Sequence, residues 1–196
     1  MAESRKAARA LLQVDAAAAE AARPYEGSMP IRVLGRFAGL GDQPPMRILC
    51  GSVIAAGLVG GDRRLARAGL HMLAAHTLAT WAKDLVKRRV DRTRPRSTGQ
   101  AGKDHHPRKG GSKAKEETSV PSGHSAGAAA VARAFARAYP EHAAAAHAAG
   151  AALALAQIPR CAHYPTDVGA GLAIGVAAEA AADAAFRLAE ARLTNP

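Results

Sequence analysis

Apolar residues follow a helical period along most of the chain, and no stretch alternates apolar and polar residues as a half-buried strand does. The pattern predicts one or two helical turns over residues 31–40 and longer helices over 2–20, 46–59, 63–89, 122–138, 141–158 and 165–193. Abundant alanine and scarce aromatic residues favour helices as well. We therefore expect an all-α fold, a single helical bundle of about five to six helices.

The length of 196 residues suits one domain with its own hydrophobic core. Residues 1–30 are expected to form an N-terminal helix and linker that carry no chemistry. Residues 31–196 are expected to form the bundle, with a long basic loop over 96–119. Trp81, the only tryptophan, lies among apolar residues and is expected in the core.

Positive charge gathers in one connecting segment. The formal net charge of the chain is +11, and residues 87–115 carry eleven Lys or Arg against two Asp. A solvated basic loop, a nucleic-acid patch and an anion site for a phosphorylated substrate all fit this charge. The segment has no aromatic side chains on which bases could stack, so nucleic acid is the less favoured partner.

Metal sites and disulfides have little support in the sequence. Cys50 and Cys161 are too few for a disulfide framework and fit no spaced metal motif. His105 and His106 are adjacent, without the spaced partners that a zinc site requires. We expect no bound metal.

Composition leaves the relation to a membrane open. Among the charge-free stretches only 142–159 reaches the roughly 18 residues of a membrane span. The small residues of 171–175 predict close helix packing in water or in lipid. Glu179 and Asp183, one turn apart, are expected on a solvated face. Polar residues interrupt the apolar core that a signal peptide would need near the N-terminus, so none is expected.

Three clusters at predicted helix ends carry candidate chemistry. Lys87 and Arg94, seven residues apart, supply two fixed cations that suit a tetrahedral oxyanion. Ser122 and Gly123 begin a helix, where unpaired backbone N–H groups attract an anion, and His124 adds a group that exchanges protons near neutral pH.

The third cluster pairs a histidine with a carboxylate. His163 and Asp167 are four residues apart at a helix start, so the carboxylate can accept from one imidazole nitrogen and make the other a better nucleophile or base. A surface ion pair would show the same spacing. Three such clusters in one order make a common site the better interpretation.

The order K-x6-R-P over 87–95, P-S-G-H over 121–124 and H-Y-P-T-D over 163–167 resembles the phosphatidic acid phosphatase type 2 superfamily. This superfamily also contains bacterial class A acid phosphatases and vanadium haloperoxidases. The resemblance implies the acid phosphatase/haloperoxidase-like helical core. It also implies a metal-independent phosphatase without a cofactor, acting on a phosphorylated lipid or a small phosphate ester.

The resemblance also assigns roles. His163 would be the nucleophile that forms a phosphohistidine, Asp167 would orient it, and His124 would protonate the leaving oxygen. The phosphate oxygens would be held by four groups: Lys87, Arg94, Ser122 and Gly123.

The third motif departs from the family pattern. The family has an arginine six residues before the nucleophilic histidine, where this chain has Gln157. Arg160 lies three residues further on and is the nearest cation in sequence. The sequence leaves three interpretations open. Arg160 could substitute for the missing cation, Gln157 could donate neutral hydrogen bonds instead, or the protein could be a relative with weakened activity.

Other functions remain as alternatives. One is a vanadium-dependent haloperoxidase built on the same pocket, and another is a non-enzymatic basic helical protein that binds nucleic acid or anionic lipid. For the phosphatase we expect a multi-pass protein of a bacterial-type cytoplasmic membrane, with the site on its outer side, and a soluble protein is the alternative. The sequence does not determine the oligomeric state.

Overall fold

The computed structural model describes residues 2–98 and 105–194, and most of them are helical. The α-helices are α1 (Ala2–Ala22), α2 (Met29–Ala38), α3 (Gln43–Val59), α4 (Arg63–Lys87), α5 (Gly123–Ala138), α6 (Ala143–Leu155) and α7 (Pro165–Thr194). The predicted all-α bundle is confirmed, with seven α-helices among the described residues rather than five to six. Short 3₁₀ turns are found at Arg23–Tyr25, Gly39–Gly41, Pro95–Ser97, Lys115–Glu117 and Pro140–His142.

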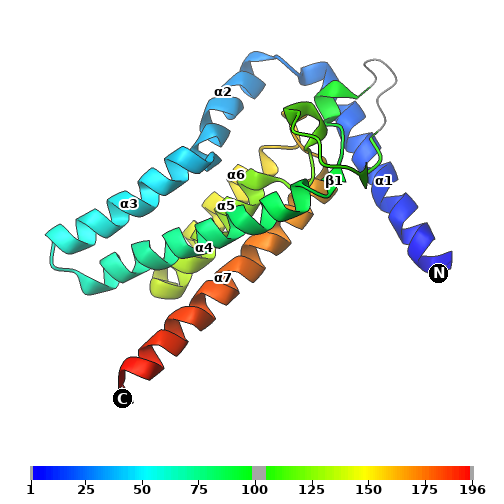
Figure 1. The fold of residues 1–196 in the computed structure, drawn as a ribbon. Helices are drawn as coiled ribbons and strands as arrows, with labels where there is room; N and C mark the ends of the chain where they lie inside the picture. Colours follow the sequence, from blue (N-terminus) through cyan, green and yellow to red (C-terminus); the bar gives the residue numbers. More distant parts are fainter. Residues whose placement is uncertain (1, 99–104, 195–196) are drawn as a thin grey trace.

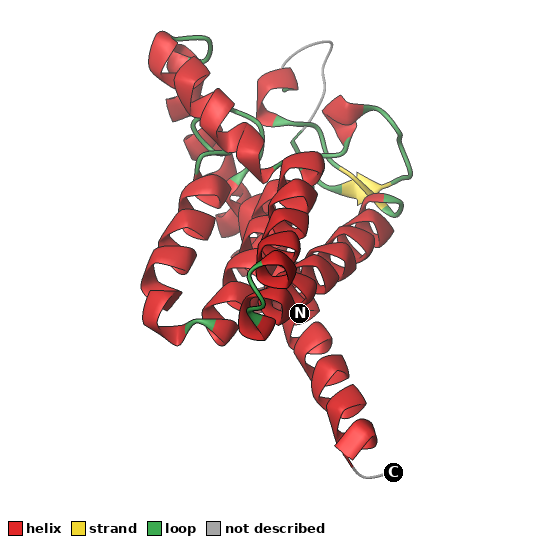
Figure 2. Ribbon diagram, turned by 90° about the vertical axis from the view of Figure 1, so that its left-hand side faces the viewer, coloured by secondary structure: helices red, strands yellow, loops and turns green. Residues whose placement is uncertain are grey.

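The connection between α4 and α5 has more structure than the predicted loop. Strands β1 (Val90–Asp91) and β2 (Arg108–Lys109) pair antiparallel, and Arg92 forms a parallel bridge with Thr118. The small sheet stands at one end of the helices (Figure 2). It ties the connection back onto the end of α4.

Helix α5 lies at the centre of the bundle and packs against α4, α6 and α7, while α3 packs along α4 (Figure 1). Two glycines in α7 permit the closest of these approaches. A Cβ on Gly171 would lie 2.4 Å from Ser122 O, and one on Gly175 would lie 2.4 Å from Ala126 O. The predicted close packing at 171–175 is therefore found, between α7 and the first turns of α5.

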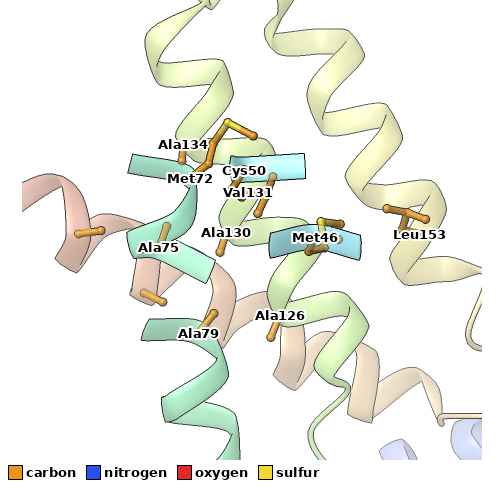
Figure 3. Close-up of a cluster of buried hydrophobic side chains, with 13 residues drawn as sticks. Met46, Cys50, Met72, Ala75, Ala79, Ala126, Ala130, Val131, Ala134 and Leu153 are labelled. Atoms are coloured by element: carbon orange, nitrogen blue, oxygen red, sulfur yellow. The ribbon is translucent and has the colours of Figure 1, made fainter. Parts of the chain in front are cut away.

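The core is built from small and flexible side chains (Figure 3). Alanines of α4 and α5, such as Ala75 and Ala130, are fully buried, and Met46, Met72 and Leu153 fill the spaces around them. Alanine gives up little side-chain entropy and allows short distances between helix axes. The helices can therefore pack tightly in a chain with few aromatic residues.

Two expectations about side-chain burial were wrong. Trp81 is 66 % exposed, because its neighbours Ala79 and Lys83 face the bundle and turn position 81 to the opposite side of α4. Glu179 is fully buried, because Arg133 and Arg137 of α5 hold its carboxylate in the bundle.

Several helix bounds also differ from the prediction. The patch over 31–40 belongs to a complete helix, α2, and α3 begins at Gln43, just after Asp42. Helix α6 ends at Leu155, short of the predicted residue 158, because the chain turns over 156–162 to reach His163. These differences concern helix ends, where the pattern of apolar residues is least informative.

The bundle has two chemically distinct ends. The end of α4 and the starts of α5 and α7 meet at one of them, where Ser122 N donates to Asp167 O at 3.0 Å. The α3–α4 and α5–α6 turns meet at the other, where Arg64 Nη2 lies 2.9 Å from Glu141 Oε1. The three predicted clusters lie at the first, which we call the site end.

Candidate active site

The start of α5 is held by Ser122, whose Oγ accepts from Ser125 N at 3.3 Å and caps the helix. Gly123 follows as the first helical residue, and a Cβ there would lie 3.1 Å from Cδ of Lys83. Backbone N–H groups at a helix start carry partial positive charge. This turn therefore offers a backbone anion site, packed against a lysine side chain, as the sequence predicts.

His163 is buried, with 3 % of its surface exposed, in the segment between α6 and α7. Its Nε2 lies 3.2 Å from Nη1 of Arg94, which also donates to Ala162 O at 2.9 Å. A guanidinium can only donate, so Nε2 accepts and the ring proton sits on Nδ1. The nitrogen that faces Arg94 is therefore the one with the free electron pair.

The carboxylate of Asp167 is fully buried beside the other side of that ring. Its Oδ2 lies 3.8 Å from His163 Nδ1, longer than a hydrogen bond, and accepts from Tyr164 N at 3.0 Å and from the Ser119 hydroxyl. Its Oδ1 accepts from Arg92 at 2.7 Å. Asp167 thus lies where it can stabilise a positive imidazole, in a carboxylate position fixed by three other donors.

Lys87 and Arg94 come together, although they do not lie on one helix. Helix α4 ends at Lys87, so no helix connects the two residues. They meet instead at Thr118 O, which accepts from Lys87 Nζ at 3.0 Å and from Arg94 Nη2 at 3.5 Å. The fold of the connection between α4 and α5 produces the pair of cations.

His124, the second residue of α5, lies beside the turn between α2 and α3. Its Nε2 is 3.1 Å from Asp42 Oδ1, close enough for an ion pair but without the alignment of a hydrogen bond. A Cβ on Gly41 would lie 3.0 Å from the ring. Asp42 is therefore a neighbour of the proposed acid that the sequence analysis did not identify.

The cations change the proton affinities of the site. Burial, together with the charges of Arg94 and Lys87 and against the opposing effect of Asp167, lowers the pKa of His163 to about 4. Burial also lowers the pKa of His124, which Asp42 raises and Arg160, Arg94 and Lys87 lower. Burial and the charge of Arg94 lower the pKa of Lys87 to about 8. Crowded cations of this kind favour the binding of an anion.

Gln157 and Arg160 form a pair. Gln157 is buried, its Nε2 donates to Leu153 O at 3.1 Å, and its Oε1 accepts from Arg160 Nη1 at 3.1 Å. Both hydrogen-bonding groups of the glutamine amide are thus engaged within the protein. The guanidinium that it holds acts electrostatically on Arg94 and His124. This arrangement favours Arg160 as the cation in place of the missing arginine.

Arg92 is the largest buried side chain of the site end and links two carboxylates. Its Nη1 donates to Asp167 Oδ1 at 2.7 Å, its Nη2 lies 2.6 Å from Asp15 Oδ2, and its guanidinium stacks 4.0 Å from the Tyr164 ring centre. Thr166 N also donates to Asp15, at 3.0 Å. The first helix, expected to carry no chemistry, therefore helps to position the start of α7.

Asp15, Arg92 and Ser119 could not be predicted as site residues from the sequence, for different reasons. Arg92 stands inside the K-x6-R-P motif, where its spacing gave no reason to separate it from the basic loop. Ser119 precedes the Pro-Ser-Gly turn, and its position there was the one available signal. Nothing local distinguishes Asp15 from the other polar residues of an alanine-rich helix.

The bundle holds a buried imidazole with a carboxylate on one side and cations on the other. This arrangement is typical of proteins that act on oxyanions such as phosphate esters. The family model of the PAP2 superfamily matches residues 68–187, which is more than half of the chain. The chain belongs to the PAP2 superfamily, and as such it is a phosphatase, a phosphoric ester hydrolase. No curated protein sequence matches it significantly.

Two solved structures share the fold. The transmembrane PAP2-type phosphatidylglycerolphosphate phosphatase of Bacillus subtilis superposes with a TM-score of 0.65 at 20 % identity, over 91 % of this chain and 87 % of that one. LpxE of Aquifex aeolicus superposes with a TM-score of 0.58 at 15 % identity, over 84 % of this chain and 91 % of that one. At these identities the likeness concerns the fold.

We expect Asp15→Asn to lower the free energy of unfolding by about 3 kcal/mol, because it leaves the buried Arg92 with one charged partner instead of two. Chemical denaturation measures this change. Glu20→Gln, an exposed position on the same helix, is the matched control and should change stability by less than about 0.5 kcal/mol. Equal stability of the two variants would show that α1 does not anchor the site.

We expect Arg160→Ala to reduce kcat/KM more than Gln157→Ala does, because the arginine carries the charge and the glutamine only holds it in place. Losing one charge-assisted contact to the transition state corresponds to roughly tenfold to a hundredfold. Steady-state kinetics on one phosphomonoester compares the two variants. The opposite ranking would rule out Arg160 as the substitute cation.

Proposed function

We propose that the protein is a metal-independent phosphatase that hydrolyses a lipid or isoprenoid phosphomonoester or diphosphate through a phosphohistidine intermediate. The observation that carries this proposal is the arrangement around His163. Nε2 faces the guanidinium of Arg94 and Nδ1 faces the side of Asp167. The imidazole therefore has its nucleophilic nitrogen on the side where cations would hold a phosphate.

In the first step His163 Nε2 attacks phosphorus, and the bond between phosphorus and the leaving oxygen breaks. His124 gives its proton to that oxygen. The positive charge that develops on His163 is stabilised by Asp167, 3.8 Å from Nδ1. A pKa of about 4 keeps His163 neutral, and therefore nucleophilic, at neutral pH.

In the second step a water molecule attacks the phosphohistidine. His124, now neutral, takes a proton from that water, and the P–N bond breaks to release phosphate and the free imidazole. The enzyme thus returns to its starting protonation state. No step needs a metal, because Lys87 and Arg94 supply the positive charge that stabilises the phosphoryl group in flight.

Arg94 has two alternative hydrogen-bond acceptors, the imidazole of His163 and a bound phosphate. Without substrate its Nη1 donates to His163 Nε2, the nitrogen that must attack. A bound phosphate offers the guanidinium charged acceptors, which form stronger hydrogen bonds than a neutral imidazole does. Substrate binding would therefore move Arg94 off the nucleophile and onto the non-bridging oxygens, beside Lys87 and the backbone of Gly123.

The outer surface of the bundle supports a membrane-bound enzyme with a lipid substrate. The segments 48–59, 68–82, 126–132, 143–155 and 168–182 form what we call the belt, which contains no Lys or Arg. Its one acidic residue, Glu179, is fully buried, while Ile48, Leu58, Leu78 and Val176 are exposed. Exposed apolar side chains without charges suit lipid better than water.

The helices differ in whether they are long enough to cross a membrane. Helix α7 has one stretch, Pro165–Leu193, that is long and apolar enough to cross a membrane. The other belt segments are shorter than the roughly 20 residues of a full span. Long arginine side chains at their ends can extend towards the headgroups, and the bilayer can thin, which allows shorter helices to cross.

An apolar cavity supports a substrate with a hydrocarbon chain. It has a volume of about 260 Å³ and is lined by residues of α3, α4, α5 and α6, among them Met46 near the start of α3. Leu49, Val53, Phe135 and Ala149 are among the residues that line it. A chain lying there could extend along the start of α3 towards His124, whose ring lies beside Gly41 in the turn before that helix.

We expect His163→Ala to abolish hydrolysis of a generic phosphomonoester and vanadate to inhibit the wild type, since vanadate adopts the trigonal-bipyramidal geometry of phosphoryl transfer. Phosphate release measures both effects. Retained activity in the variant would contradict the phosphohistidine, and vanadate-dependent halide oxidation with peroxide would favour the haloperoxidase alternative.

We expect kcat/KM for an alkyl phosphate to be highest in a window that opens near pH 4 and closes below pH 6.5. Above this window His124, whose pKa is lowered from 6.5, loses the proton that it must donate. Below it His163 gains a proton at a pKa of about 4 and can no longer attack. A pH–rate profile measures both limits.

The control for this profile is His124→Asn, because the second ionisation of the substrate phosphate also falls near pH 6. In that variant the alkaline limit should move to about pH 8, where Lys87 loses its charge. An unchanged profile would assign the limit to the substrate and contradict the role of His124.

We expect Ala149→Trp to raise KM for a long-chain lipid phosphate at least tenfold and to leave KM for a short-chain phosphate unchanged, because the indole fills the apolar cavity. Ala151→Trp, at an exposed position of α6 outside the cavity, is the matched control. Equal KM values for the two variants on the long-chain substrate would remove the cavity from substrate binding.

A further inference from the structure

A second cavity lies at the end of the bundle opposite the site end. It has a volume of about 650 Å³ and is bordered by the start of α4, the end of α5 and the second half of α7. Five arginines line it: Arg63, Arg64, Arg67, Arg137 and Arg187. None of them belongs to the three sequence motifs or to the candidate active site, so the phosphatase reaction does not explain why they gather here.

Positive charge exceeds negative charge around this cavity. The charged groups that line it and their ion-pair partners are six arginines and four acids. The pairs are Arg64 with Glu141, Arg67 with Glu190, Arg133 and Arg137 with Glu179, and Arg187 with Asp183. Arg63 is exposed and lies outside these pairs. The excess of two positive charges matches the negative charge of a phosphate group.

The ion pairs also leave hydrogen-bond donors for a ligand. Arg64 uses Nε for Ala138 O and Nη2 for Glu141, and Arg137 uses Nε and Nη2 for Glu179. Arg187 uses the same two nitrogens for Asp183. Among the described residues Nη1 of these three guanidiniums has no acceptor, so its N–H groups remain available. Guanidinium groups bind phosphate oxygens in such forked contacts.

His71 of α4 belongs to the wall of the cavity and is itself buried, with 8 % of its surface exposed. Its ring packs against Phe186, with 5.3 Å between the ring centres. Its Nε2 has no hydrogen-bond partner in the described part of the chain, since Glu179 Oε1, at 3.7 Å, is too far for a bond. Buried polar atoms are nearly always paired, and an oxygen of a ligand in the cavity would satisfy this one.

The charges around His71 favour an anion over a metal ion. His71, Glu179 and Asp183 each offer a ligand atom, and these atoms lie within 4.8 Å of one another. Both carboxylates, however, already bind arginines. A divalent cation between them would lie close to these guanidiniums and be repelled by their charge.

We propose that this cavity is a second binding site, which holds the phosphate group of a ligand between the arginines and His71. The cavity borders the belt, because Ala68 begins one belt segment and Asp183 directly follows another. In a membrane this is the level of the lipid headgroups, and basic pockets between helices bind anionic ones. A lipid headgroup and a soluble phosphate compound share this chemistry. The site goes beyond the proposed function and does not require catalysis.

Binding to the purified full chain in detergent tests the proposal. The probes are dioctanoyl phosphatidylglycerol and inorganic phosphate, and isothermal titration calorimetry measures their dissociation constants. We expect R63Q/R67Q to weaken binding in the cavity at least tenfold, because two guanidinium partners are lost. R192Q, at an exposed position of α7 outside the cavity, is the matched control and should change binding less than twofold. Equal affinities of the two variants for both probes would overturn the proposal.

The two probes distinguish the sources of the phosphate group. Arginine-dependent binding that is at least tenfold tighter for the lipid supports a headgroup site, and comparable binding of inorganic phosphate supports a site for a soluble phosphate compound. A third probe tests the competing chemistry. Binding of manganese or zinc ions that is lost in His71→Ala, without arginine-dependent binding of either phosphate probe, would overturn the proposal in favour of a metal site.

Activity separates this cavity from the active site, where phosphate also binds under the proposed function. R63Q/R67Q should keep the wild-type kcat/KM for a phosphomonoester, because the two arginines lie at the start of α4 and Lys87 at its end. Parallel loss of binding and of activity would place the lost binding at the active site and overturn the proposal. A wild type without phosphatase activity, but with arginine-dependent binding, would refute the proposed function and support the second site.

Discussion

The site end depends on the ion pairs that the buried guanidinium of Arg92 forms with two carboxylates. This guanidinium bonds to Asp15 of α1 and to Asp167 of α7, and it stacks on the ring of Tyr164. Burying a charge is costly unless it is paired and fully hydrogen-bonded, so removing either carboxylate would leave the buried guanidinium with one charged partner instead of two. This requirement holds three distant parts of the chain together: the first helix, the segment that follows β1 and the start of α7.

The same guanidinium determines where the reactive groups stand. Asp167 receives Arg92 on one oxygen and Ser119 and Tyr164 N on the other, so the carboxylate is fixed beside His163 without a hydrogen bond between them. The imidazole is then oriented from its other side by Arg94. Buried and surrounded by cations, His163 stays neutral at physiological pH, which is the state a nucleophile needs.

Much of the candidate site could be predicted from the sequence, because each of its clusters is local. The Pro-Ser-Gly turn and the helix that it begins need only a capping serine and a run of alanines, and α5 indeed starts at Gly123 with Ser122 as its cap. The sequence alone shows that Gln157 stands where the family has an arginine. The consequence of this replacement could not be predicted, since only the folded chain shows that the glutamine amide holds Arg160.

The sequence by itself determined the helical class, the family and the candidates for the reactive residues, because these follow from local periodicity and short motifs. Only the tertiary structure decided which of the many charges are buried together. Asp15 is separated from Arg92 by 77 residues, and Trp81 points away from the core although it lies in an apolar stretch. Long-range ion pairs depend on how the helices pack, and so does the choice of which side of a helix faces the core. No local pattern of residues specifies this packing.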